Sequence, residues 1–156
     1  MKRQLSKSDV DKLNSEIMVR FGVEDFFVKK DRVAMADIEH HVYVVKEDLV
    51  CFFYYEGLLV PALKLLLQRP LLKQVVVDMG AIKFVSSGAD IMRPGIVELD
   101  HKIRKDELVV VVDQTHRKPL CVAQALFSGE EIFSMKQGKV LRNLHWVGDP
   151  FWNAVP

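Results

Sequence analysis

The stretch Asp78–Gly95, DMGAIKFVSSGADIMRPG, decides how the second half of this chain is interpreted. It follows the apolar run Val75–Val77, and Asp78 is placed to cap a helix that ends at Gly88, a residue suited to a left-handed stop. Residues Arg93–Ile96 read as a tight turn, because proline presets the first central dihedral angle and glycine accepts a positive one at the second. The stretch therefore predicts a strand end, a short helix, a glycine stop and a turn.

Helical spacing from about Gly80 onward divides the side chains of this segment into two faces. The face predicted to pack holds Ala81, Ile82, Phe84 and Val85, and the face offered to a partner holds Lys83, Ser86, Ser87 and Asp90. The small residues 86–89 would let an extended partner approach the backbone, and hydroxyl and amide groups can donate to phosphate or ribose oxygens. Lys83 and Arg93, both expected to be exposed, would bracket the strip with positive charge. A solvated amphipathic helix without a ligand is the alternative.

Three stretches of the chain carry a resemblance to a known family. DMGAIKFVSSGADIMRPGI resembles the opening of a PUA domain, the RNA-binding module named after pseudouridine synthases and archaeosine transglycosylases. PALKLLLQRPLL upstream and LHWVGDPFW near the C-terminus are similar to the linker helix and closing strand of the malignant-T-cell-amplified-sequence family. Those translation proteins pair with density-regulated protein or are fused to its equivalent in ligatin. The resemblance covers the chain nearly end to end.

The resemblance implies a function and a binding surface. The function is RNA binding in translation, in which the protein grips a tRNA, with its acceptor CCA end as one option, or ribosomal RNA during initiation or recycling. The implied partners are RNA, the small ribosomal subunit and a density-regulated-protein-like protein. Carried over residue by residue, the RNA-binding positions are Lys83, Ser86, Ser87, Gly88, Ala89, Arg93, Pro94 and Gly95, with Arg117 and Lys118 as weaker additions.

Two other function classes stay open on the residues alone. The protein is interpreted alternatively as a protein-interaction adaptor, or as the RNA-targeting subunit of an RNA-modification enzyme. No catalytic residue, cofactor or metal is predicted in this chain, because the sequence has no glycine-rich phosphate loop, GxSxG or HExxH. The one suggestive cluster is Asp37, Glu39, His40 and His41, but neighbouring strand residues point to opposite faces of a sheet.

The fold class expected is α+β, with a small N-terminal α/β domain at 1–73 followed by a PUA-type β pseudobarrel at 74–156. The first domain is predicted to contain a helix at 8–21 with a Ser8–Asp11 capping box and a stop at Gly22, then an antiparallel meander at 26–55. A leucine-rich helix follows from Pro61 to residue 68, with Leu63, Leu66 and Leu67 buried. In the second domain, strands are predicted at 75–77, 96–99, 107–113, 120–127 and 138–146, with a short helix at 128–134.

Composition limits the class of protein and its binding mode. The chain has 156 residues, of which 49% are hydrophobic, so it can bury a sizeable core. Its net charge is +1, and each half is nearly balanced, with 12 basic and 11 acidic residues before Gln74 and 10 of each from there on. Any RNA binding must therefore depend on local clustering of charge. Cys51 and Cys121 are expected to be buried free thiols, and the N-terminus resembles no signal peptide, which makes the cytoplasm the expected location.

Overall fold

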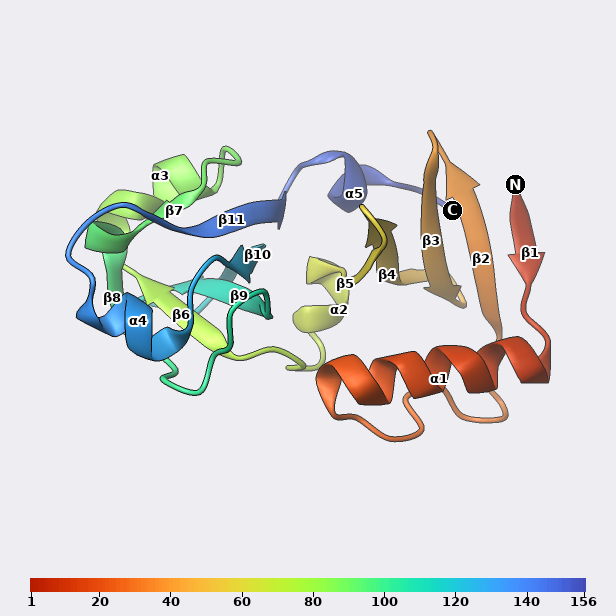
Figure 1. Cartoon of the computed structure of the whole chain (residues 1–156). Helices are drawn as coiled ribbons and strands as arrows, with labels where there is room; N and C mark the ends of the chain where they lie inside the picture. Colours follow the sequence, from red (N-terminus) through yellow and green to blue (C-terminus); the bar gives the residue numbers. More distant parts are fainter. The chain divides into compact units, whose positions relative to one another are not determined.

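The computed structural model describes residues 1–156 and divides into two compact units (Figure 1). The N-terminal unit comprises Met1–Leu71 together with Ala154–Pro156, and the C-terminal unit comprises Leu72–Asn153. Each unit contains one β-sheet and its own hydrophobic core. The division of the chain into domains at 1–73 and 74–156 stays a prediction. No helix in the chain combines the length and the apolar character needed to cross a membrane.

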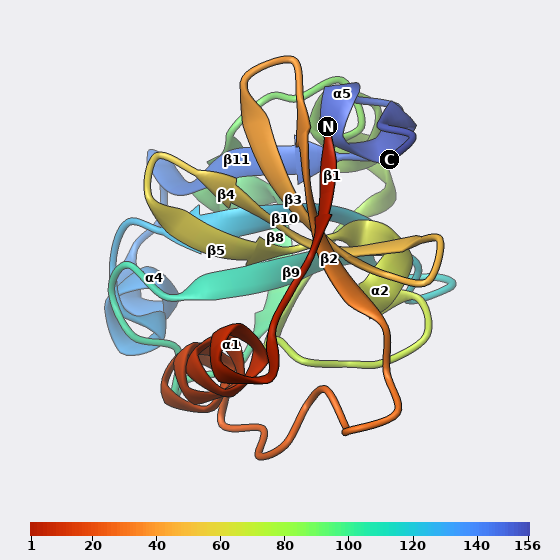
Figure 2. The ribbon, with the colours of Figure 1, turned by 90° about the vertical axis from the view of Figure 1, so that its right-hand side faces the viewer.

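The N-terminal unit is a five-stranded antiparallel sheet with a long helix on one face (Figures 1 and 2). The strands lie in chain order and are β1 (Lys2–Gln4), β2 (Val33–Ile38), β3 (His41–Lys46), β4 (Leu49–Tyr55) and β5 (Leu58–Pro61). The helices are α1 (Lys7–Phe21) and α2 (Leu63–Leu66). From β2 to β5 each strand joins the next by a tight turn, which is the meander that the short apolar runs predict, whereas α1 and a loop separate β1 from β2.

Helix α1 ends as predicted but begins one residue earlier, at Lys7. Gly22 has φ +71° and donates its N–H to the Met18 carbonyl, as expected of a left-handed stop. The capping box is formed by Ser6 and Asp9, not by Ser8 and Asp11, because each of the first pair accepts the other's backbone N–H. The buried side chains of the helix, Leu13 and Ile17, pack into the core around Phe52.

Two other expectations for this unit were wrong. Phe26–Val28 is not a strand, because Asn14 binds the backbone of Phe27 in both directions, at 2.9 and 3.0 Å, and turns both phenylalanine rings into the core. The leucine-rich helix is a single turn, since Pro61 still pairs with Phe52 as the last residue of β5. Within that turn Leu65 is buried, and Leu67 is 53% exposed.

The C-terminal unit is a six-stranded sheet with the order β7-β11-β10-β9-β6-β8. Its strands are β6 (Gln74–Val77), β7 (Ile91–Met92), β8 (Ile96–Leu99), β9 (Leu108–Asp113), β10 (Pro119–Ala125) and β11 (Lys139–Trp146). Its helices are the 3-10 turns η1 (Met79–Ala81) and η2 (Arg93–Gly95), and α3 (Ile82–Val85), α4 (Gly129–Ser134) and α5 (Pro150–Asn153). Only the β6–β9 pair is parallel. The α+β class is confirmed, although β7 and α5 were not predicted.

Candidate nucleic-acid interface

The predicted helix after β6 is present, but in two short pieces. Asp78 caps the first piece, η1, by accepting the Ala81 N–H at 2.9 Å, as the sequence predicts. The second piece, α3, is one turn long and passes into the turn that contains Gly88, whose φ is +94°. Both local signals, the aspartate cap and the positive φ of Gly88, are therefore confirmed, while the single continuous helix is not.

The orientation of Phe84 differs from the prediction. Its side chain was expected to pack, yet Phe84 is 63% exposed, whereas Val85 is only 2% exposed. Ile82 and Val85, three positions apart, define the inward face of the single turn, and each helical residue rotates by about 100°, which carries Phe84 away from that face. Ala81 belongs to the 3-10 turn before α3, yet it packs against the same core as predicted.

The exposed residues around this turn form what we call the α3 surface, which consists of Lys83, Phe84, Ser86, Ser87 and Ala89. Lys83 makes no ion pair, so its ammonium group is available to an anion. The Ser87 hydroxyl donates to the Lys83 carbonyl at 2.9 Å, which leaves the Ser86 hydroxyl as the free donor. The surface therefore presents a cation, a hydroxyl and an aromatic ring within one helical turn and the loop that follows.

Strand β11 holds the α3 surface in place through hydrogen bonds from Asn143. Asn143 donates from its side chain to the carbonyls of Val85 and Ala89, both at 3.0 Å, and its backbone N–H reaches the Asp90 carboxylate at 2.9 Å. The other oxygen of Asp90 pairs with Lys139 at 3.2 Å, which offsets its negative charge. Sequence reasoning missed Asn143, although an asparagine in the middle of an apolar strand is unusual and was the available signal.

Arg93 has a structural role that the sequence did not indicate. It was expected to be exposed, but its guanidinium is half-buried and donates to the carbonyls of Ile132 at 2.7 Å and Ile96 at 3.1 Å. These bonds link the first residue of β8 to α4 through the Arg93 side chain. Arg93 therefore offers less charge to a ligand than Lys83 does, and any substitution of it also removes structural hydrogen bonds.

The turn between β9 and β10 places Arg117 and Lys118. Asp113 is 4% exposed and accepts three backbone N–H groups, from Thr115 at 3.0 Å, His116 at 2.6 Å and Lys118 at 3.2 Å. The bond from His116, followed by those from Lys118 and Thr115, holds the pKa of the Asp113 carboxyl below its ordinary value. Arg117 extends from this turn to Glu98, at 2.9 Å.

The structure brings most of the predicted binding residues onto one side of the C-terminal unit. Gly95 accepts the Asp78 N–H at 2.9 Å, so Pro94 and Gly95 lie beside the start of η1. Thr115 contacts the Met79 sulfur at 3.0 Å, which joins the β9–β10 turn to the same 3-10 turn. The helix, the Arg93–Gly95 turn and the turn with Arg117 and Lys118 are therefore contiguous, although the Arg93 guanidinium itself faces α4.

This sheet with its glycine loop defines a class of protein. The model of the family described as PUA domain matches residues 73–147, so the C-terminal unit is a PUA domain, a class of RNA-binding module. The crystal structure of a hypothetical protein from Pyrococcus horikoshii is 30% identical and superposes with a TM-score of 0.84, covering 97% of this chain and 98% of that one.

Relatives define the family more narrowly. The chain is 42% identical to an uncharacterized protein of Methanocaldococcus jannaschii, over 96% of this chain and 93% of the relative. It is 32% identical to malignant T-cell-amplified sequence 1 of Rattus norvegicus, over 96% and 88%, and 30% identical to translation machinery-associated protein 20 of Schizosaccharomyces pombe, over 85% and 77%. The chain belongs to this family of PUA-domain proteins, and the names of its members associate the family with translation.

Proposed function

We propose that this protein binds unpaired RNA through the α3 surface and acts in translation. Its ligand is either the acceptor end of a tRNA or a single-stranded segment of ribosomal RNA, bound during initiation or recycling. The observation that carries the proposal is the 63% exposed ring of Phe84 beside the unpaired ammonium group of Lys83. Unpaired bases stack on exposed aromatic side chains, while a neighbouring cation contacts the phosphate.

The rest of the α3 surface supports the same ligand. Ser86 provides a hydroxyl donor, and the small side chain of Ala89 lets an RNA strand approach the backbone. Because Asn143 fixes the loop before any ligand arrives, binding loses little conformational entropy on the protein side. No side chain of the surface forms a planar pair of donors aimed at a base edge. We therefore infer that the surface recognises unpaired RNA without selecting a particular base sequence.

The relatives' names support the proposed setting. Names such as translation machinery-associated protein 20 agree with a cytoplasmic protein that meets tRNA or the small ribosomal subunit. By the same family membership we propose a density-regulated-protein-like partner. We assign the RNA contact to the C-terminal unit, since that unit is the PUA domain.

Fluorescence anisotropy with a tRNA, with and without its 3′ CCA end, tests the proposal. We expect Phe84→Leu to weaken binding about tenfold, because loss of one stacked base costs roughly 1–3 kcal/mol. Lys83→Glu should weaken it further, since it replaces an attraction to phosphate by a repulsion. Phe133→Leu is the matched control, because Phe133 is 60% exposed in the same unit but lies on α4.

The outcomes separate the possible ligands. Loss of affinity in both α3 variants with an unchanged control supports the proposal, and dependence on the CCA end identifies the acceptor end. If wild type binds neither tRNA nor ribosomal RNA fragments, the proposal is wrong. If Phe133→Leu weakens binding as much as Phe84→Leu does, the contact is not confined to the α3 surface.

A further inference from the structure

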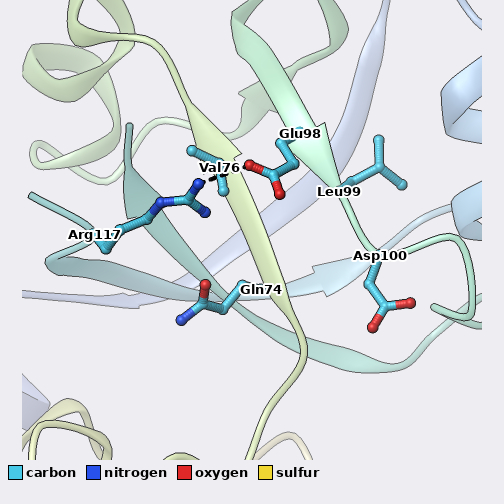
Figure 3. Close-up of a pocket in the computed structure, with 6 residues that line it drawn as sticks. All are labelled: Gln74, Val76, Glu98, Leu99, Asp100 and Arg117. Carbon is cyan, nitrogen blue, oxygen red and sulfur yellow. Dashed lines mark hydrogen bonds and ion pairs between the residues drawn. The ribbon is translucent and has the colours of Figure 1, made fainter. Parts of the chain in front are cut away.

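A hollow in the C-terminal unit lies apart from the α3 surface, on β6 and β8. It has a volume of about 380 Å³ and is lined by Gln74, Val76, Glu98, Leu99, Asp100 and Arg117 (Figure 3). That volume falls within the range of small-molecule sites in proteins. The lining is mixed, with two apolar residues, Val76 and Leu99, and charged side chains of both signs.

Strand geometry explains why these residues share one face. Val76 pairs directly with Glu98 across β6 and β8, so the two side chains point to the same side of the sheet. Gln74 lies two positions before Val76, and Asp100 two positions after Glu98, which extends the same face at the other end of the strands. Figure 3 shows Arg117 and Glu98 at one end of the hollow, with Gln74 and Asp100 at the other. Val76, at 2% exposure, is the floor.

Arg117 reaches the hollow from a backbone that is held in an uncommon conformation. Its φ is +55°, a left-handed value that is unfavourable for a side chain such as arginine. The buried Asp113 fixes this turn through three backbone N–H groups and so maintains the strained conformation. The arrangement places the guanidinium at 2.9 Å from Glu98, on the rim of the hollow.

The two carboxylates of the hollow are oriented, and each keeps one oxygen without a protein donor. Glu98 uses Oε2 for Arg117, and Asp100 uses Oδ1 for the Lys102 N–H at 2.8 Å. Oε1 of Glu98 and Oδ2 of Asp100 accept no hydrogen bond from the chain. Two carboxylates and one guanidinium give the rim a net negative charge, which disfavours a phosphate inside the hollow and favours a neutral ligand rich in hydroxyl donors.

We propose that this hollow binds a ribonucleoside through its vicinal 2′ and 3′ hydroxyl groups. A carboxylate accepts hydrogen bonds from ribose hydroxyls in nucleotide sites of other folds, and two oriented carboxylates match two adjacent donors. The Gln74 amide meets the base edge, Val76 lies under the nucleoside, and Arg117 on the rim meets a phosphate on the 5′ side. The same chemistry comes from two sources, a free nucleoside or the 3′ end of an RNA strand, the one place in RNA with both hydroxyls free.

The alternative in which the ribonucleoside is the 3′ end of an RNA strand rests on the proposed function. Within the C-terminal unit, the contact between Thr115 and Met79 joins the turn that bears Arg117 to η1, which leads directly into α3. An unpaired strand on the α3 surface therefore has a continuous protein surface to follow toward the hollow.

The first test compares two RNA 3′ ends and neutralises one carboxylate of the hollow at a time. The full chain is titrated with a single-stranded RNA ending in a free 3′ diol and with the same RNA ending in a 3′ phosphate. We expect the diol end to bind about tenfold tighter or more, since hydrogen bonds to charged groups are strong, and Glu98→Gln or Asp100→Asn to abolish that difference. Both variants should lower the affinity for the diol-ended RNA, whereas a purely electrostatic effect would raise it, because removing a negative charge strengthens RNA binding. Glu130→Gln, an exposed change of equal charge on α4, is the control.

A second measurement separates the two sources and the two proposals. Adenosine and 2′,3′-dideoxyadenosine are titrated into the isotope-labelled full chain, and amide shifts are followed by NMR. Shifts at Gln74, Glu98 and Asp100 with adenosine alone support the diol site for either source, even if the chain binds no RNA and the proposed function fails. Equal RNA affinity for both 3′ ends together with no adenosine shift overturns the diol site and leaves the α3 proposal standing. Shifts with N-acetylarginine amide but not with adenosine overturn it in favour of a basic protein partner.

Discussion

At the scale of single residues, Gly88 shows how a backbone position shapes the binding loop. Its φ is +94°, and a Cβ added there would lie 2.8 Å from the Trp146 ring, which is closer than side chains pack. We therefore expect Gly88→Ala to lower the free energy of unfolding by about 2–4 kcal/mol, from the unfavourable dihedral angle and the overpacking together. Urea unfolding of the full chain measures it.

Gly138 is the matched control for that prediction. Its φ is +100°, but the nearest atom to an added Cβ is the Met135 methyl at 4.0 Å, so Gly138→Ala meets the dihedral cost without a clash. We expect it to cost about 1 kcal/mol. Equal losses for the two variants would mean that the Trp146 ring moves aside and that Gly88 does not need to be small.

Sequence reasoning at this scale worked where the cause was local. Asp78 and Gly88 were predictable, because a cap and a left-handed stop depend on residues a few positions away. Phe84 was not, because its exposure depends on which side of a single turn meets the core. Arg93 was not, because its acceptor on Ile132 lies 39 positions along the chain. Side-chain direction at the candidate site is set by such long-range contacts.

At the scale of elements, the β9–β10 turn links the protonation of one carboxyl to stability. The pKa of Asp113 is lowered in the folded chain, first by the His116 N–H bond. A carboxyl with a depressed pKa stabilises the fold above its unfolded pKa, and that contribution is lost as the pH falls through the folded pKa. We expect wild type to be more stable than Asp113→Asn at pH 7, and the difference in melting temperature to shrink as the pH falls below the ordinary aspartate value of about 4.

Thermal melts between pH 7 and pH 2 provide the measurement. Glu24→Gln is the control, because Glu24 is exposed in a loop and makes no hydrogen bond or ion pair. Its melting temperature should follow wild type at every pH. A difference between wild type and Asp113→Asn that stays constant across the range would show that the turn is held by the shape of the side chain and not by its charge.

Element by element, the strands of the C-terminal half were the most predictable. β9 contains four consecutive valines and is buried along its whole length, as expected of a strand covered on both faces. β8 was predicted with its observed bounds. The two-residue strand β7 and the one-turn helix α5 were missed, because segments that short show no periodicity and are stabilised by their neighbours.

At the scale of the whole molecule, the near-zero net charge determines how RNA binding responds to salt. With a net charge of +1, the chain has no broad attraction for a polyanion, so the affinity depends on a few local contacts. Each phosphate contact to a single strand contributes about 0.7 to the slope of log K against log salt. For about three contacts, made by Lys83 and its neighbours, we expect a slope near −2.

Two lysine variants show which part of the molecule makes the phosphate contacts that determine this slope. Lys83→Gln should reduce its magnitude by about 0.7, because one phosphate contact is lost. Lys12→Gln, an exposed change of equal charge on α1 of the N-terminal unit, should leave the slope unchanged. Anisotropy titrations at four salt concentrations measure both. If Lys12→Gln lowers the slope as much as Lys83→Gln does, RNA contacts extend over both units, and the α3 surface is only one part of a larger interface.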